Sequence, residues 1–251
     1  MKRAQACRII KCSRNNKYYE KKMPNKDKTI KEAIQQVMGK SRKGRVKIIR
    51  MVQKNHPELG SSRIRRVYQQ EGLALTKRLR RRIHLNPSNP IELSLALNKE
   101  WGADFMSDAL VDGRKIRTFN VVDHFNRECK GITISHSLPA RRIIEIFERM
   151  IEKYGKPQKI RTDNGPEFTS KRFQSWLSDQ KIKWSKIQKG SPWQNAIVER
   201  FNRTYREDIL DANWFYNINQ AQQITDEWIE DYNNERPHEA LDYQTPKQYA
   251  A

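Results

Sequence analysis

Residues 159–168, KIRTDNGPEF, begin as a β-strand and end in a sharp turn. The first four residues are suited to a strand, whereas the Asn-Gly-Pro that follows Asp163 stops one, because Gly tolerates positive φ and Pro cannot donate to a strand ladder. We therefore expect Asp163 at the very end of the strand, with its carboxylate directed out of the sheet. A charged group in that position needs a binding partner.

The surrounding sequence predicts a mixed sheet. Three β-rich runs precede this strand, separated by Asp112-Gly113, which is a hairpin signal, and by Asn126-Arg127. The expected elements are strands at 100–111, 115–125 and 128–138, a helix at 139–154 ending at Gly155, the strand 159–163, a helix near 170–179, a strand at 181–187 and a long helix from about 192. Antiparallel strands followed by helix–strand units form an α/β sheet flanked by helices. This order resembles the ribonuclease H-like fold.

The positive charge of the chain is concentrated in its first two fifths. The 251 residues carry a net charge of +21, and residues 1–99 contain 27 Lys and Arg against 6 Asp and Glu, while residues 100–251 contain 23 of each. Phosphate neutralisation requires such a concentration of cations, so nucleic-acid binding is favoured over the alternative of a solvated basic tail.

Short amphipathic helices are expected within this basic part. Thr29 and Glu32 have capping-box spacing for a helix at 27–39, and further helices are expected at 45–55, at 61–72 from a Ser cap to Gly72, and at 73–83 with Thr76 as its cap. The last helix carries a cluster of cations: Lys77, Arg78, Arg80, Arg81 and Arg82. A helix-turn-helix region is predicted, and the alternative is a plain helical bundle with a basic face.

Several other classes of protein are disfavoured. The chain has no run of 18 apolar residues that could span a membrane, and its start lacks the long apolar region of a secretory signal. Cys7, Cys12 and Cys129 contain no CxxC pair. Reduced thiols of a cytosolic protein are therefore expected rather than disulfides or a zinc cluster.

Two further acidic residues accompany Asp163. Asp104 lies within an apolar strand, where a carboxylate is costly unless it is paired or bound to a metal; the alternative is the exposed face of an edge strand. Glu199 is expected two turns into the long helix, after the helix-start signature of residues 191–194. Its alternative role is an i,i+4 ion pair with Arg203.

The long helix is expected to bury one stripe and to expose another. At about 100° per residue, the buried stripe comprises Trp193, Ile197, Phe201 and Tyr205, and the exposed face comprises Asn195, Glu199, Arg203 and Arg206.

Three carboxylates would meet if the first and fourth strands are neighbours. They would repel one another unless a cation lies between them, and their oxygens suit Mg²⁺ or Mn²⁺ rather than zinc. Two such ions can stabilise the attacking and leaving oxygens of a phosphodiester during its displacement.

Four segments, WGADF, TDNGPEF, SPWQNAIVERFNR and YNNERPHEALDYQTP, resemble the integrase-type DDE transposases of bacterial insertion sequences, in particular their second-reading-frame products. The resemblance spans nearly the whole chain, and its ordered acids are separated by 58 and 35 residues. It implies that Asp104, Asp163 and Glu199 are catalytic and bind two Mg²⁺ or Mn²⁺ ions. The implied reaction cuts the ends of the element, and the freed 3′-hydroxyl then attacks target DNA without a covalent protein–DNA intermediate.

The resemblance also implies the organisation of the chain. The expected parts are a basic segment at 1–26, a helix-turn-helix-like region at 27–84, a linker at 85–98, the integrase catalytic core at 99–214 and, at 215–251, a C-terminal helix and tail packed through Trp228 and Tyr232. The scattered histidines and the lone Cys7–Cys12 pair lack the zinc-site pattern of retroviral integrases, which favours the bacterial branch.

The implied partners are the terminal inverted repeats of the element, target DNA, further copies of the chain and a first-reading-frame protein or frameshift fusion, in the bacterial cytoplasm at the nucleoid. Expected DNA contacts are Lys77, Arg78, Arg80, Arg81, Lys183, Lys186, Lys189, Asn195, Arg203 and Arg206. The alternative for Lys183, Lys186 and Lys189 is a solvated loop. Asn164, Asn195 and Arg203 are expected to support the triad, and the alternative for each is structural hydrogen bonding.

Two rival functions use the same residues. One is a non-mobile nuclease of this fold, which would cut RNA hybrids or branched DNA without joining strands. The other is a DNA-binding protein that no longer catalyses and that binds through residues 41–84, unaffected by metal.

Overall fold

The computed structural model describes residues 23–38, 44–73, 94–188 and 192–250. The described residues form two compact units, a helical one made of 23–38 and 44–73 and an α/β one made of 94–188 and 192–250. None of the helices described in these ranges is long and apolar enough to cross a membrane.

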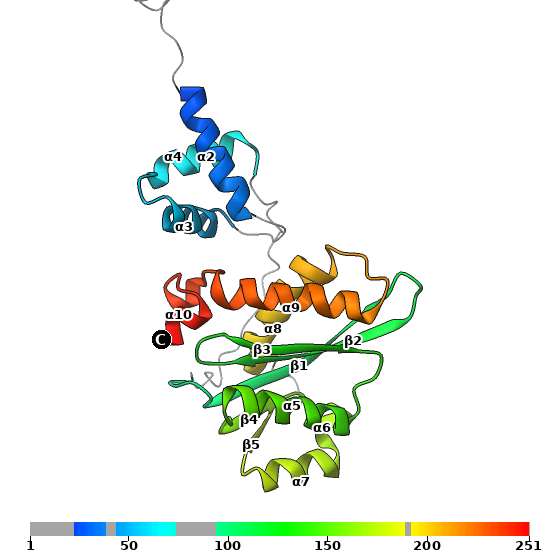
Figure 1. Cartoon of the computed structure of the whole chain (residues 1–251). Helices are drawn as coiled ribbons and strands as arrows, with labels where there is room; N and C mark the ends of the chain where they lie inside the picture. Colours follow the sequence, from blue (N-terminus) through cyan, green and yellow to red (C-terminus); the bar gives the residue numbers. More distant parts are fainter. Residues whose placement is uncertain (1–22, 39–43, 74–93, 189–191, 251) are drawn as a thin grey trace, which may run out of the picture. The chain divides into compact units, whose positions relative to one another are not determined.

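The described residues of the small unit form three helices: α2 (Met23–Met38), α3 (Arg45–Asn55) and α4 (Ser61–Gln70) (Figure 1). Their apolar stripes form one core of Ile30, Ala33, Ile34, Val37, Ile48, Val52, Ile64, Val67 and Tyr68. Arg66 of α4 donates both of its terminal nitrogens to Asp27 of α2, at 2.6 and 3.0 Å. The three predicted helices are thus confirmed.

The helix ends differ from prediction. Helix α2 begins at Met23, so Thr29 and Glu32 lie inside the helix and cannot form a capping box. Helix α4 begins at Ser61 with Gly60 at its N-cap and no side-chain cap, so the predicted Ser cap is wrong. The cations Lys77, Arg78, Arg80, Arg81 and Arg82 of the predicted last helix lie outside the described residues.

A five-stranded sheet in the order β3-β2-β1-β4-β5 forms the centre of the α/β unit. Its strands are β1 (Glu100–Ala109), β2 (Lys115–Asp123), β3 (Cys129–Ser135), β4 (Lys159–Thr162) and β5 (Lys183–Lys186). The first three are antiparallel, whereas β4 runs parallel to β1, and β5 runs parallel to β4. This is the ribonuclease H-like arrangement that the sequence predicts, with the first and fourth strands as neighbours.

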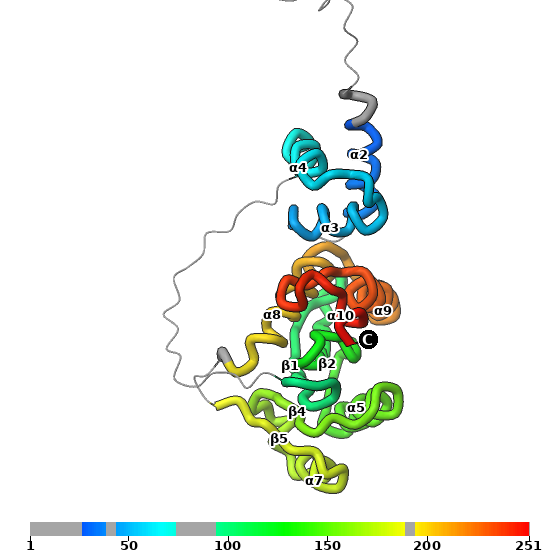
Figure 2. The backbone as a smooth tube through the Cα atoms, turned by 90° about the vertical axis from the view of Figure 1, so that its left-hand side faces the viewer, coloured from blue at the N-terminus to red at the C-terminus, as the bar shows by residue number. Residues whose placement is uncertain are grey.

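Helices cover both faces of this sheet (Figures 1 and 2). The helices are α5 (Ala140–Tyr154), α6 (Pro166–Thr169), α7 (Lys171–Asp179), α8 (Ala196–Tyr205), α9 (Ile218–Asn234) and α10 (Pro246–Ala250). An aromatic core under α5 and α7 includes Phe119, Phe147 and Phe173. The core under α8 and α9 contains Trp228 and Tyr232, which are buried as predicted.

Glycines mark the predicted turns. Gly113 has φ of +83° in the β1–β2 hairpin, and Gly155 has φ of +85° at the end of α5, a conformation that favours glycine over residues with a side chain. Position 102 of β1 requires glycine for a different reason: a Cβ there would lie 2.2 Å from Nε2 of His124 and 2.4 Å from a methyl group of Val198. This close approach brings α8 onto β1.

Side-chain amides from α9 bind the free edge of β3. Asn233 accepts from the backbone N–H of Cys129 at 2.9 Å and donates to the Cys129 carbonyl at 3.0 Å. Gln222 accepts from the N–H of Ile134 at 2.9 Å and donates to the carbonyl of Ile132 at 2.8 Å. An occupied edge strand cannot pair with the strand of another chain.

Candidate active site

Asp104 lies on β1, a central strand of the sheet, so the edge-strand alternative is wrong. Its Oδ1 accepts from the N–H of Phe105 and its Oδ2 accepts from Nδ2 of Asn202 on α8, both at 2.8 Å. Asn202 in turn accepts at 2.7 Å from Asn120, the residue opposite Asp104 on β2. Two amides in series therefore fix the orientation of the carboxylate.

Asp163 follows the last residue of β4 and is exposed, as the sequence predicts. The last β1–β4 pair is Gly102 with Arg161, so continuing this register by two residues would bring Asp104 opposite Asp163. Oδ1 of Asp163 accepts from the N–H of Gly165 at 3.0 Å, which fixes the turn. Asn164 donates to the carbonyl of Ile187 at 2.9 Å and so has the structural role that was its alternative.

Glu199 is exposed near the start of α8. A 3₁₀ turn at Pro192–Asn195 precedes the helix, and Asn195 is its N-cap, so Glu199 lies in the first α-helical turn and not two turns in. The positive end of the helix dipole stabilises a carboxylate there. Glu199 and Arg203, both within the described residues, form no ion pair, which removes the alternative role for Glu199.

The three carboxylates influence one another electrostatically. Burial, opposed by the hydrogen bond from Phe105, raises the pKa of Asp104 to about 6, and the charges of Asp163 and Glu199 add to the increase. Among the described residues, none of the three forms an ion pair, and no three His, Cys, Asp or Glu side chains are grouped closely enough to hold a metal as they stand. No cation among the described residues therefore offsets the repulsion between the three acids.

The 3₁₀ turn explains a wrong prediction about helix faces. Asn195 is 5% exposed rather than outward-facing, and its Oδ1 has no hydrogen-bond partner among the described residues. A 3₁₀ turn advances about 120° per residue instead of 100°, so residues before and after it do not share the expected face. Phe201 and Tyr205 are buried as predicted, Ile197 is partly buried, and the side chain of Trp193 lies outside the described part of the structure.

The predicted DNA-contacting cations have different surroundings. Arg203 is exposed, but Arg206 donates to the carbonyl of Ser107 at 2.8 Å and lies 3.6 Å from Asp108. Lys183 and Lys186 are exposed on β5, with Nζ of Lys186 4.2 Å from the centre of the Trp184 ring. Lys189 lies outside the described residues.

Sequence reasoning missed the residues that support these acids. Arg161 donates to Glu100 at 2.5 Å and to the carbonyl of Gln194 at 2.8 Å, which ties β4 to the 3₁₀ turn before Glu199. Asn202 follows Phe201 of the predicted stripe and is buried in the structure, where a polar side chain requires a hydrogen-bond partner; the stripe itself did not include it.

The comparisons with known proteins identify the family of the chain. Residues 96–192 and 180–246 match two models that are both described as the integrase core domain. The 31.7 kDa protein of insertion element IS407 from Burkholderia multivorans is 32% identical over 248 residues, which cover 98% of this chain and 90% of that protein. The chain belongs to the family of insertion-sequence transposases with an integrase core domain.

A second relative supports the assignment, and a solved structure shares the fold. The transposase for insertion sequence element IS904 of Lactococcus lactis is 31% identical to this chain; the match covers 65% of this chain and 66% of the Lactococcus protein. A chain in the structure of the simian T-cell lymphotropic virus intasome, bound to the PP2A regulatory subunit B56 gamma, shares the fold with a TM-score of 0.57 at 18% identity, covering 83% of this chain and 70% of that one. Family membership places the chain among the polynucleotidyl transferases of transposition and DNA integration.

Proposed function

We propose that this transposase cleaves DNA at the ends of its insertion sequence and transfers the resulting 3′-hydroxyl to target DNA, with Asp104, Asp163 and Glu199 as the metal ligands. The observation that carries the proposal is the β1–β4 register, which brings Asp104 opposite Asp163 at one end of the sheet, with the charge of Glu199 also acting on Asp104. Such a site gains stability from a divalent cation that all three carboxylates face.

The residues fit a hard cation such as Mg²⁺ or Mn²⁺. All three donors are carboxylates, and each oxygen of Asp104 accepts a single hydrogen bond, which leaves further lone pairs for a metal. Two ions bound there would supply an activated attacking oxygen and a stabilised leaving oxygen. The number of ions is part of the proposal.

The chain itself orients the ligands. Asn202 and Asn120 hold the plane of the Asp104 carboxylate, and the turn at Gly165 holds Asp163. Arg161 holds the carbonyl of Gln194, which positions the start of α8 and with it Glu199. A fixed constellation of ligands reduces the reorganisation that the reaction requires.

The remaining parts have proposed roles in DNA handling. Residues 27–84, including Lys77, Arg78, Arg80 and Arg81, would bind DNA, residues 85–98 would act as a linker, and 99–214 would form the catalytic core. Lys183, Lys186, Lys189 and Arg203 would contact the substrate backbone. We also propose assembly of several copies on DNA and cooperation with a first-reading-frame protein or fusion, in the bacterial cytoplasm at the nucleoid.

A strand-joining assay tests the proposed reaction. Labelled DNA from the ends flanking the gene is incubated with Mg²⁺ and either wild type or Glu199→Gln. We expect wild type to join strands and the variant to lose joining by at least about 100-fold while keeping its DNA affinity, because the charge of a metal ligand is removed but the shape is kept. Joining by Glu199→Gln at the wild-type rate would refute the assignment.

The same assay separates the rivals. Cleavage by wild type without joining, in the presence of first-reading-frame protein, would indicate a nuclease. DNA binding without any reaction, under the same conditions and with no response to metal, would indicate a DNA-binding protein that no longer catalyses.

A further inference from the structure

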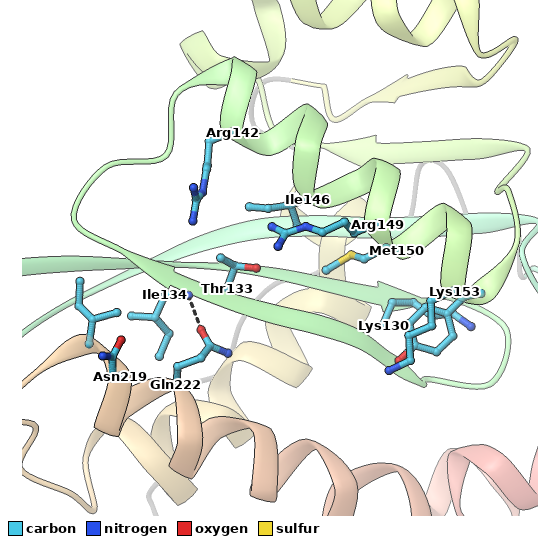
Figure 3. Close-up of a pocket in the computed structure, with 12 residues that line it drawn as sticks. Lys130, Thr133, Ile134, Arg142, Ile146, Arg149, Met150, Lys153, Asn219 and Gln222 are labelled. Atoms are coloured by element: carbon cyan, nitrogen blue, oxygen red, sulfur yellow. Dashed lines mark hydrogen bonds between the residues drawn. The ribbon is translucent and has the colours of Figure 1, made fainter.

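A pocket of about 460 Å³ lies between α5, β3 and α9 in the α/β unit (Figure 3). It includes none of the three acids of the candidate active site, and β2 separates its strand, β3, from β1. Arg142, Ile146, Arg149 and Met150 come from α5, Thr133 and Ile134 from β3, and Asn219 and Gln222 from α9.

Four cations and no carboxylate line this pocket. Lys130 is buried and already paired with Glu128 at 2.7 Å, and Lys153 lies 4.9 Å from the centre of the Tyr154 ring. Among the described residues, Arg142 forms no ion pair, and the hydrogen bond that Arg149 donates is to the carbonyl of Glu145, at 3.3 Å. Both guanidinium groups are therefore available to an external anion.

The three solvent-exposed cations share one face of α5. Arg142, Arg149 and Lys153 are spaced at i, i+7 and i+11, which places them within about 40° of one another and spreads them over about 16 Å. Figure 3 shows Arg142 extending from α5 toward the space in front of β3 and α9. Arg141, the preceding residue, instead pairs with Glu145 at 2.9 Å.

We propose that this pocket binds phosphate groups of a DNA backbone, so that the β3 edge is a second DNA-contacting surface apart from the carboxylates. The proposal rests on the proposed function in that DNA is the substrate. Guanidinium groups bind phosphate oxygens in a bidentate geometry, and the Thr133 hydroxyl and Asn219 amide offer further polar groups on the opposite walls. The Gln222 amide is already hydrogen-bonded to the backbone of β3, so it lines the pocket but is not assigned a phosphate contact.

A second copy of the chain is a less suitable occupant. In a two-fold symmetric contact this surface would be buried against the same surface of the partner copy, and the pocket lining holds no carboxylate that could neutralise Arg142 and Arg149 there. A DNA backbone instead supplies negative charge along the whole length of α5.

The salt dependence of DNA binding tests the proposal. Binding of the full chain to a duplex is measured in EDTA between about 50 and 300 mM salt, for wild type, Arg142→Gln with Arg149→Gln, and the control Arg141→Gln. The slope of log affinity against log salt is expected to become shallower by about 0.9 for each phosphate that the protein no longer neutralises, hence by about 1 to 2 in the double variant and not at all in the control.

Three outcomes would overturn the proposal. The first is a double variant that is folded, as shown by an unchanged unfolding midpoint, and that keeps the wild-type slope. The second is a double variant that shifts the monomer–dimer equilibrium in sedimentation while its slope is unchanged, which would make the face an interface between copies. The third is wild type without salt-dependent DNA binding, which alone would also refute the proposed function.

Discussion

At the residue scale, Asp104 and His124 both have shifted pKa values, and burial is the largest cause of each shift. The charges of two other acids add to the raised pKa of Asp104. The pKa of His124 is instead lowered to about 3, by burial first and then by the charges of Arg161 and Arg127. Neither ring nitrogen of His124 has a hydrogen-bond partner among the described residues. Its Nδ1 lies 3.9 Å from Glu100, but a ring with so low a pKa is neutral at pH 7 and forms no ion pair.

The buried His124 should make stability depend on pH. Its folded pKa lies below the value of about 6.5 in the unfolded chain, so its contribution is full above pH 6.5 and is lost as the pH falls from 6.5 toward 3. We expect this residue to add about 1.4 kcal/mol per pH unit to the slope of unfolding free energy between pH 6 and 4. Urea unfolding of wild type and His124→Gln across this range measures the difference; parallel slopes would show that His124 is not held neutral.

At the element scale, much of the fold follows from local patterns. The Asn-Gly-Pro after Asp163, the Asp-Gly hairpin and the helix end at Gly155 all occur where the sequence predicts them. The start of α8 could not be predicted, because the choice between a 3₁₀ and an α turn at Pro192–Asn195 depends on contacts such as that of Arg161 with Gln194. Helix propensities do not contain that information.

The same limit applies to the site. The three acids are identifiable from spacing, but the bond between Asn202 and Asp104 joins residues that are 98 positions apart and depends on how α8 crosses β1. The pocket beside α5 combines three elements and likewise has no local signature.

The Arg161–Glu100 pair should be the strongest link between β4 and the elements around it. Glu100 is 3% exposed, so Arg161→Met leaves a buried carboxylate without its partner, and we expect a loss of about 3 kcal/mol in unfolding free energy. All six tryptophans lie between residues 101 and 228, so their fluorescence reports on the α/β unit.

The matched control is the double variant Arg161→Met with Glu100→Gln, which removes the unpaired charge and should recover more than half of the lost stability. A single variant as stable as wild type, or a double variant that recovers nothing, would show that the pair is not what links these strands.

At the scale of the whole molecule, charge and chemistry are assigned to different parts of the chain. The excess of cations lies in residues 1–99, whereas residues 100–251 are balanced and contain all three acids. DNA affinity should therefore depend mainly on the basic part, and catalysis on the α/β unit. The pocket beside α5 is the exception, because it is a basic surface within the balanced part.

We propose that the three carboxylates hold divalent cations for a reaction on DNA. The most direct measurement is Mn²⁺ binding to the full chain by electron paramagnetic resonance, with flanking-end DNA present, for wild type, Asp163→Asn and Glu199→Gln. We predict bound Mn²⁺ in wild type and a loss of at least about 10-fold in affinity in each variant, because each removes one charged ligand. Equal Mn²⁺ binding by wild type and both variants would contradict the claim.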